Sequence, residues 1–76
     1  MIKTVVDTNI IVSAFISSLG NPAKILNLIL NDEILIYYNN IILLEYEEVL
    51  LRPFLKTDHK KITKLLDVLK KIGLYL

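Results

Sequence analysis

The chain has 76 residues, which is room for one small domain. Hydrophobic residues make up 54% of it, against about 45–50% in an average soluble domain, so we expect either a dense core or an apolar surface that a partner covers. There is no cysteine, which excludes disulfides and thiolate metal sites. Nine Lys and Arg nearly balance eight Asp and Glu, so an attraction to nucleic acid would have to come from a local patch.

The sequence contains no segment typical of a membrane protein. Its longest uncharged stretch, residues 8–23, includes Asn, Ser, Gly and Pro, whereas a spanning helix needs about 20 mostly apolar residues. Asp7 interrupts the apolar run near the N-terminus, which disfavours a signal peptide. We therefore expect a cytoplasmic protein without membrane contact.

The first half of the chain is predicted to form one strand and two helices. Residues 2–6 are a short run with β-branched side chains and predict a buried strand. A helix is expected over residues 9–17, followed by a break at residues 18–22. Asn21 can cap the next helix, and Pro22 suits its first position because the N–H that proline lacks is not needed there. This helix is expected to end at Leu30.

The second half is predicted to repeat this order. Residues 34–38 form a second apolar strand, and Asn39 or Asn40 can cap a helix over residues 41–51. Thr57 or Asp58 can cap the last helix, which Gly73 is expected to end. An apolar stripe at helical spacing supports this helix: Ile62, Leu65, Leu66, Leu69 and Ile72.

The order strand, helix, helix, strand, helix, helix predicts an α/β fold, a Rossmann-like parallel sheet flanked by helices. The largely apolar character of both runs favours helices on both faces of the sheet. A parallel sheet of two strands is a poor free-standing unit. We therefore expect residues 1–76 to be part of a larger domain, truncated after the second helix pair.

Asp7 is the first candidate for chemistry. Ligands of open parallel sheets bind outside the carboxyl ends of the strands, and Asp7 follows the first strand directly. Thr8 and Asn9 add a hydroxyl and an amide beside the carboxylate. The structural alternative is that Asp7 caps the first helix.

Glu45 is the second candidate. It is expected near the end of the first turn of the helix that follows the second strand, close to the sheet edge that carries Asp7. Adjacent strands lie about 4.8 Å apart, so the two carboxylates could share one hard cation. The alternative is an exposed glutamate favoured by the helix dipole. Glu48 and Arg52 are spaced as an i,i+4 ion pair, so we interpret Glu48 as structural.

Two segments resemble a known family. Residues 5–15 read Val-Val-Asp-Thr-Asn-Ile-Ile-Val-Ser-Ala-Phe, similar to the opening of PIN domains, whose first strand ends in Asp-Thr-Asn. Residues 42–53 read Ile-Leu-Leu-Glu-Tyr-Glu-Glu-Val-Leu-Leu-Arg-Pro, similar to the second motif of the family's toxin branch. The Gly-Asn-Pro turn at residues 20–22 also fits that branch. The likeness covers essentially the whole chain.

The resemblance implies a VapC-like ribonuclease, the toxin component of a toxin–antitoxin module, with RNA as substrate and a cognate antitoxin as partner. In that family an acidic cluster binds Mg²⁺ or Mn²⁺, and its first two acids map onto Asp7 and Glu45. Thr8, Asn9 and Ser13 match the supporting polar residues. The family's later acids have no match here, since Asp58 and Asp67 follow no predicted strand. The resemblance thus implies the N-terminal half of a PIN domain with an incomplete acidic site.

Two interpretations of this chain remain open. One is a metal-dependent endoribonuclease, and the other is a non-catalytic remnant or interaction module that binds an antitoxin or forms a homodimer through exposed apolar faces. The C-terminal third is also rich in lysine, which fits either attraction to RNA phosphates or a solvated helix face. A Rossmann-type nucleotide site would need a glycine-rich first turn, which Asp7-Thr-Asn9 lacks. An aspartyl phosphatase would usually have a second Asp where Asn9 stands.

Overall fold

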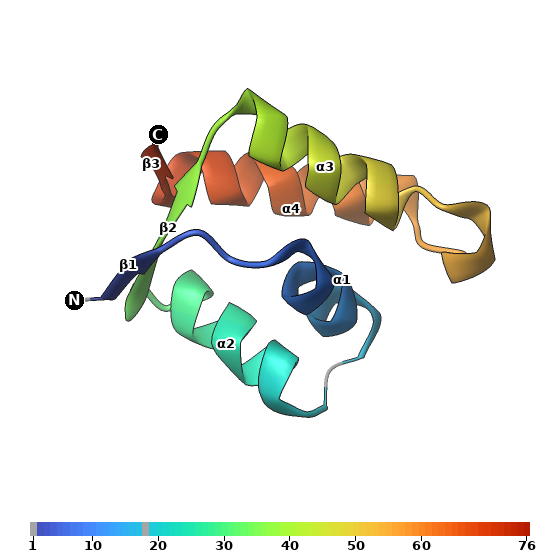
Figure 1. Ribbon diagram of the computed structural model, residues 1–76. Coiled ribbons are helices and arrows are strands. Elements are labelled where there is room, and N and C mark those ends of the chain that lie inside the picture. Colours follow the sequence, from blue (N-terminus) through green and yellow to red (C-terminus); the bar gives the residue numbers. More distant parts are fainter. Residues whose placement is uncertain (1, 18) are drawn as a thin grey trace.

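The computed structural model describes residues 2–17 and 19–76 (Figure 1). In these residues the chain forms a parallel sheet and four α-helices, with one short 3₁₀ helix. The elements in chain order are β1 (Ile2–Thr4), α1 (Thr8–Ile16), α2 (Asn21–Leu30), β2 (Ile34–Tyr38), α3 (Asn40–Leu50), η1 (Pro53–Leu55), α4 (His59–Ile72) and β3 (Leu74–Tyr75). The predicted α/β class and the order of the first six major elements are therefore confirmed.

The sheet contains one strand more than the sequence predicted. Its order is β1-β2-β3 and both pairings are parallel, with Ile2 opposite Ile34 and Tyr37 opposite Leu74. β3 has two residues, too few for any periodic pattern, so only its pairing with β2 reveals it. β1 in turn ends at Thr4 rather than at residue 6, because residues 5–7 leave the sheet and lead into α1.

The helices of the described residues lie on one side of the sheet, to its right in Figure 1. The expectation of helices on both faces was wrong for this part of the chain. Both crossovers run in the same direction, from β1 to β2 and from β2 to β3, and right-handed crossovers in one direction place their helices on one face. Along β2, Ile34, Ile36 and Tyr38 belong to the core or pack against it.

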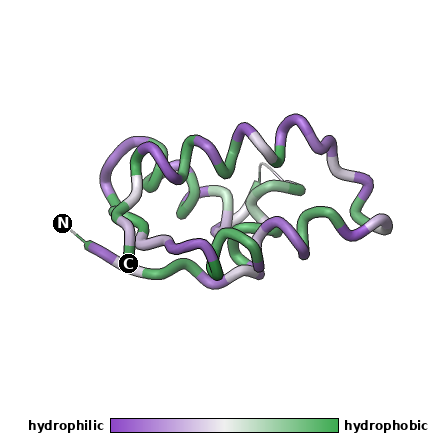
Figure 2. Tube along the Cα trace, turned by 90° about the horizontal axis from the view of Figure 1, so that it is seen from above, coloured by the Kyte–Doolittle hydropathy of each residue, from purple (hydrophilic) through white to green (hydrophobic). Residues whose placement is uncertain are grey.

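The core lies between the sheet and the helices. Ile36 of β2, Ile11 of α1, Leu50 of α3 and Leu69 of α4 are almost completely buried, with exposed fractions of 0–1%. Among the described residues, the hydroxyl of the buried Tyr46 is the only polar side-chain group in this core, which contains no charged side chain. Figure 2 shows the consequence along α4, which turns its hydrophobic residues inward and its hydrophilic residues outward.

Side-chain caps define the starts of three helices. Asp7, Asn39 and Asp58 each accept a hydrogen bond from a backbone N–H of the first turn that follows, and Asp58 is thus the cap predicted for the last helix. The predicted cap of α2 was one residue too late, because Asn21 is already helical and Gly20 precedes it.

Gly73 ends α4, as predicted, but its position has a further cause. A Cβ at this residue would lie 2.7 Å from the Leu69 carbonyl oxygen and 2.9 Å from the Ile36 carbonyl oxygen. Only a residue without a side chain lets the end of α4 approach β2 this closely. Gly73 therefore connects the helix directly to β3.

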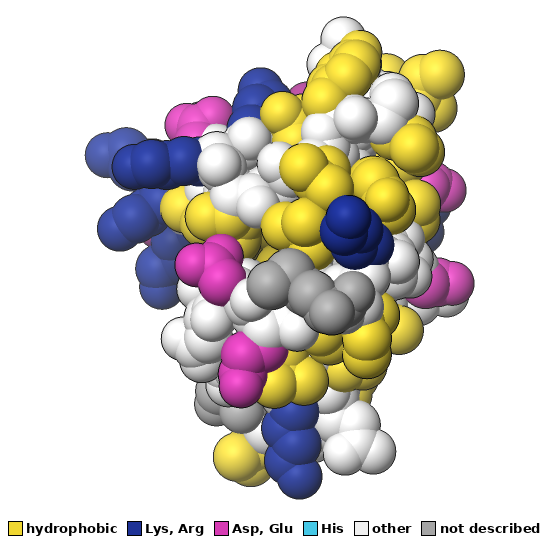
Figure 3. All heavy atoms as spheres, turned by 90° about the vertical axis from the view of Figure 1, so that its left-hand side faces the viewer, with side chains coloured by type: hydrophobic (Ala, Val, Ile, Leu, Met, Phe, Trp, Pro, Cys, Tyr) yellow, Lys and Arg dark blue, Asp and Glu magenta, His cyan; other side chains and the backbone are white. Residues whose placement is uncertain are grey.

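Hydrophobic side chains also cover much of the surface at the sheet end of the molecule (Figure 3). Several of them belong to the sheet or to the residues next to it, and among these Ile2, Val5 and Tyr75 are 64%, 48% and 66% exposed. The high hydrophobic content of the sequence is thus divided between a core and an apolar surface. Across the described residues, every helix is too short or too polar to span a bilayer.

Candidate functional site

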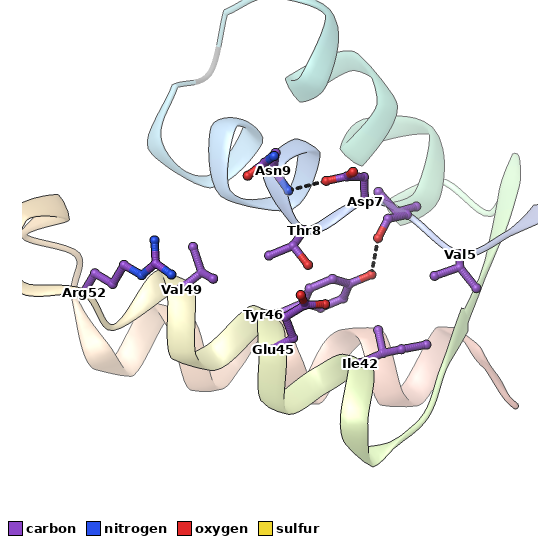
Figure 4. A pocket seen from close by; sticks show the side chains of 10 residues that line it. Val5, Asp7, Thr8, Asn9, Ile42, Glu45, Tyr46, Val49 and Arg52 are labelled. Atoms are coloured by element: carbon purple, nitrogen blue, oxygen red, sulfur yellow. Dashed lines mark hydrogen bonds between the residues drawn. The ribbon is translucent and has the colours of Figure 1, made fainter.

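A polar pocket lies where the start of α1 faces α3, beyond the end of β1 (Figure 4). Its volume is about 460 Å³. Six of the side chains that line it carry polar groups: Asp7, Thr8, Asn9, Glu45, Tyr46 and Arg52. Apolar groups form its walls, and Arg52 lies at the end of the pocket toward η1. The structure thus brings the two candidate acids from distant parts of the sequence into one cavity.

The Asp7 carboxylate both caps α1 and lines the pocket. Its Oδ1 atom accepts a hydrogen bond of 2.7 Å from the Asn9 backbone N–H, which caps α1. The side chain is nonetheless exposed and lines the pocket. A carboxylate has a second oxygen, so capping and ligand binding do not compete for the same atom. The two interpretations of Asp7 from sequence are therefore compatible.

Glu45 reaches the pocket from α3. The Asn39 side chain starts this helix by accepting a 2.8 Å hydrogen bond from the Ile42 N–H, so the helix begins one residue earlier than expected. Glu45 consequently lies in the second turn rather than at the end of the first. Its side chain is exposed and points toward the side of the pocket that carries Thr8 (Figure 4).

Tyr46 ties the two acid-bearing segments together. Its side chain is 1% exposed, and its hydroxyl donates a 2.6 Å hydrogen bond to the Val6 carbonyl oxygen, 40 residues away in sequence. The tyrosine is the neighbour of Glu45, and Val6 is the neighbour of Asp7. One hydrogen bond therefore joins the side chain next to Glu45 to the backbone next to Asp7.

The electrostatics of Tyr46 report on the same proximity. Burial, together with the smaller effects of the negative charges of Glu45 and Asp7, raises the pKa of Tyr46 to about 12. The hydroxyl is therefore neutral at physiological pH and able to donate its hydrogen bond. The sequence analysis did not identify this bond. The available signal was a hydroxyl at an inward-facing position, where phenylalanine would fill the same space.

The remaining candidate residues are distributed around this pocket. Ser13 lies on α1, one turn beyond Asn9, and is not among the residues that line the pocket. Glu48 is exposed on α3 and does not line it either, whereas Arg52 does. Within residues 2–17 and 19–76, no group of three or more Asp, Glu, His or Cys residues is arranged to hold a metal ion.

The donor atoms of the pocket suit a hard divalent cation. Two carboxylates, a hydroxyl and an amide are all oxygen donors, the type that Mg²⁺ and Mn²⁺ prefer. Mg²⁺ is commonly held by one or two carboxylates together with phosphate oxygens and water. The residues present therefore fit a weakly held ion that a phosphate ligand completes.

A family model described as the PIN domain matches residues 3–75. The chain belongs to the PIN domain family. It is also 36% identical over 75 residues to uncharacterized protein MJ1680 of Methanocaldococcus jannaschii. That match covers 95% of this chain and 48% of the relative, so the chain spans about half the length of the curated relative it matches. No solved structure matches the chain.

The family match includes every residue that lines the acidic pocket. The match covers both motifs, the one that contains Asp7 and the one that contains Glu45. Membership of the PIN domain family points to a nuclease role. The parallel sheet and its helices are the corresponding α/β fold.

Proposed function

We propose that this chain contributes to a metal-dependent endoribonuclease site of the PIN type, in which Asp7 and Glu45 bind Mg²⁺ or Mn²⁺. The strongest support is that two carboxylates from distant parts of the sequence line one polar pocket. The family match supports the same assignment because it covers both acidic motifs.

In this proposal the polar neighbours assist the two acids. Thr8 and Asn9 line the pocket beside them and can orient water or a phosphate oxygen. Ser13, one turn along α1, would act from the edge of the site. The hydrogen bond by which Asp7 caps α1 holds its carboxylate in place. The hydrogen bond from Tyr46 to the Val6 carbonyl oxygen holds α3 next to the segment that carries Asp7.

The reaction proposed is hydrolysis of a phosphodiester bond in RNA. A water oxygen bonds to phosphorus, the bond from phosphorus to one ribose oxygen breaks, and that oxygen takes up a proton. A bound divalent ion would lower the pKa of water and offset the negative charge of the phosphate group. The part of this chain is to supply the two carboxylates and to orient the groups around them.

We also propose the biological setting that the sequence resemblance implies. The protein would act in the cytoplasm as the toxin component of a toxin–antitoxin module and would be neutralised by a cognate antitoxin. Residues 1–76 would correspond to the N-terminal half of a PIN domain.

A second candidate function is binding of a partner protein without catalysis, either an antitoxin or a second copy in a homodimer. The observation in its favour is the exposure of large apolar side chains, among which Leu19 and Ile41 are 80% and 79% exposed. Apolar surface of this kind marks interaction sites when it is contiguous.

The metal site can be tested by titrating the protein with Mn²⁺ and following the free-ion signal by electron paramagnetic resonance. Asp7→Asn and Glu45→Gln should each weaken Mn²⁺ binding at least tenfold, equivalent to about 1.4 kcal/mol. Glu48→Gln is the matched control, because Glu48 is an exposed acid on α3 outside the pocket lining. Equal affinities in all four proteins would overturn the metal site.

Cleavage is tested separately with a single-stranded RNA in Mn²⁺. Cleavage should stop in EDTA and should fall in the two acid variants but not in Glu48→Gln. Mn²⁺ binding without any cleavage would overturn the catalytic proposal and support the partner-binding function.

A further inference from the structure

A second, smaller pocket adjoins the acidic one beyond the end of α3. It has a volume of about 90 Å³ and is formed by the η1 turn and the start of α4. Three basic side chains line it: Arg52, Lys56 and His59. Arg52 also lines the acidic pocket, so the two cavities share one wall.

The turn that carries these residues is held in a defined conformation. The Lys56 N–H donates to the Pro53 carbonyl oxygen at 3.2 Å, and the Thr57 hydroxyl donates to the Leu50 carbonyl oxygen. Lys56 itself has a left-handed backbone with φ of 52°. This conformation costs a residue with a side chain about 1–2 kcal/mol and favours Gly or Asn. Lysine is therefore an uncommon choice for the turn, and it adds a positive charge to the pocket.

The ionisable side chains that line this second pocket are all basic. No carboxylate is among the described residues that line it. Asp58 is the acid nearest in sequence, and its Oδ1 atom accepts a hydrogen bond from the Lys60 N–H at the start of α4. Arginine binds phosphate through two parallel hydrogen bonds, and lysine binds it as a point charge. A pocket that contains both an arginine and a lysine suits a phosphate. Because it adjoins the pocket of Asp7 and Glu45, the ligand that fits both pockets is an anion with repeated phosphates.

We propose that this basic pocket, lined by Arg52, Lys56 and His59, binds the backbone phosphates of a single-stranded RNA beside the bond that lies in the acidic pocket. The inference rests on the proposed nuclease function, which makes RNA the substrate. It also limits the proposed phosphate contacts to a few of the basic residues in the lysine-rich C-terminal third. Lys60, Lys61 and Lys64 are exposed on α4 without lining either of these two pockets.

The test is binding of a fluorescein-labelled single-stranded RNA, measured by fluorescence anisotropy in EDTA so that nothing is cleaved. For single strands, the logarithm of the affinity falls with the logarithm of salt concentration by about 0.7 per phosphate contact. Arg52→Gln and Lys56→Gln should therefore each reduce this slope by about 0.7 and weaken binding about fivefold near 0.1 M salt. The double variant should show about twice the change in slope.

Lys71→Gln is the control, with the same loss of charge. Lys71 is exposed in the last turn of α4, and this helix of 14 residues is about 20 Å long, so the control lies far from the basic pocket. If Lys71→Gln weakens RNA binding as much as Arg52→Gln and Lys56→Gln, the basic pocket is not the phosphate site. Because EDTA removes the metal, this result is independent of the Mn²⁺ titration that tests Asp7 and Glu45.

Discussion

The contact between α1 and α3 has a buried side and an open side that differ in what they require of their residues. On the buried side, Ile11 and Leu50 are 0% exposed and Tyr46 is 1% exposed. On the open side, Asp7 and Glu45 are exposed and line the acidic pocket. The buried side determines where the two segments lie, and the open side determines what they can bind. Stability and chemistry should therefore respond to different substitutions.

The largest expected effect is on the buried side. Leu50→Ala removes a completely buried side chain and leaves a cavity, so the free energy of unfolding should fall by about 2–5 kcal/mol. Leu44→Ala on the same helix is the control, because Leu44 is 56% exposed and its loss should cost less than about 0.5 kcal/mol. Urea unfolding followed by circular dichroism measures both. Similar losses in the two variants would show that the buried side does not dominate stability.

An intermediate effect is expected at Tyr46, where the two sides meet. Tyr46→Phe leaves the Val6 carbonyl oxygen without its buried hydrogen bond, which should lower the free energy of unfolding by about 1–2 kcal/mol. Because the lost bond joins the segments of the two acids, Mn²⁺ affinity should also fall. A variant that is less stable but binds Mn²⁺ like the wild type would confine Tyr46 to a structural role.

The raised pKa of Tyr46 predicts that the free energy of unfolding depends on pH. The pKa of Tyr46 in the folded protein is raised to about 12, above the usual tyrosine value of about 10, so the neutral form is favoured by folding. This contribution to stability is complete below pH 10 and is lost as the pH rises toward 12. Unfolding measured across this range should show a steeper loss of stability in the wild type than in Tyr46→Phe. Parallel curves would contradict it.

The smallest effect on stability is expected on the open side, at Asp7. Asn caps helices as well as Asp does, so Asp7→Asn should change the free energy of unfolding by less than about 0.5 kcal/mol while it weakens Mn²⁺ binding. Asp7→Ala removes the cap as well and should cost about 1 kcal/mol. Thermal unfolding of the pair separates the two roles of this carboxylate. Equal stability of the two variants would mean that the cap contributes nothing.

Much of the fold could be predicted from short-range patterns. The apolar run at residues 34–38 and the stripe from Ile62 to Ile72 correspond closely to β2 and α4, because backbone periodicity alone defines such elements. Asp58 was identified as a cap because capping depends on neighbouring residues only. The two-residue strand β3 could not be found in this way, since it exists only through its pairing with β2.

The sequence by itself determined the α/β class, the family and the two acids that motif order assigns to one sheet edge. These depend on local periodicity and on residue identity, which a linear chain already contains. Only the tertiary structure decided that the helices cover one face of the sheet, that Tyr46 bonds to Val6 and that Arg52 borders both pockets. Each of these features depends on how whole elements pack against one another, which local sequence patterns do not specify.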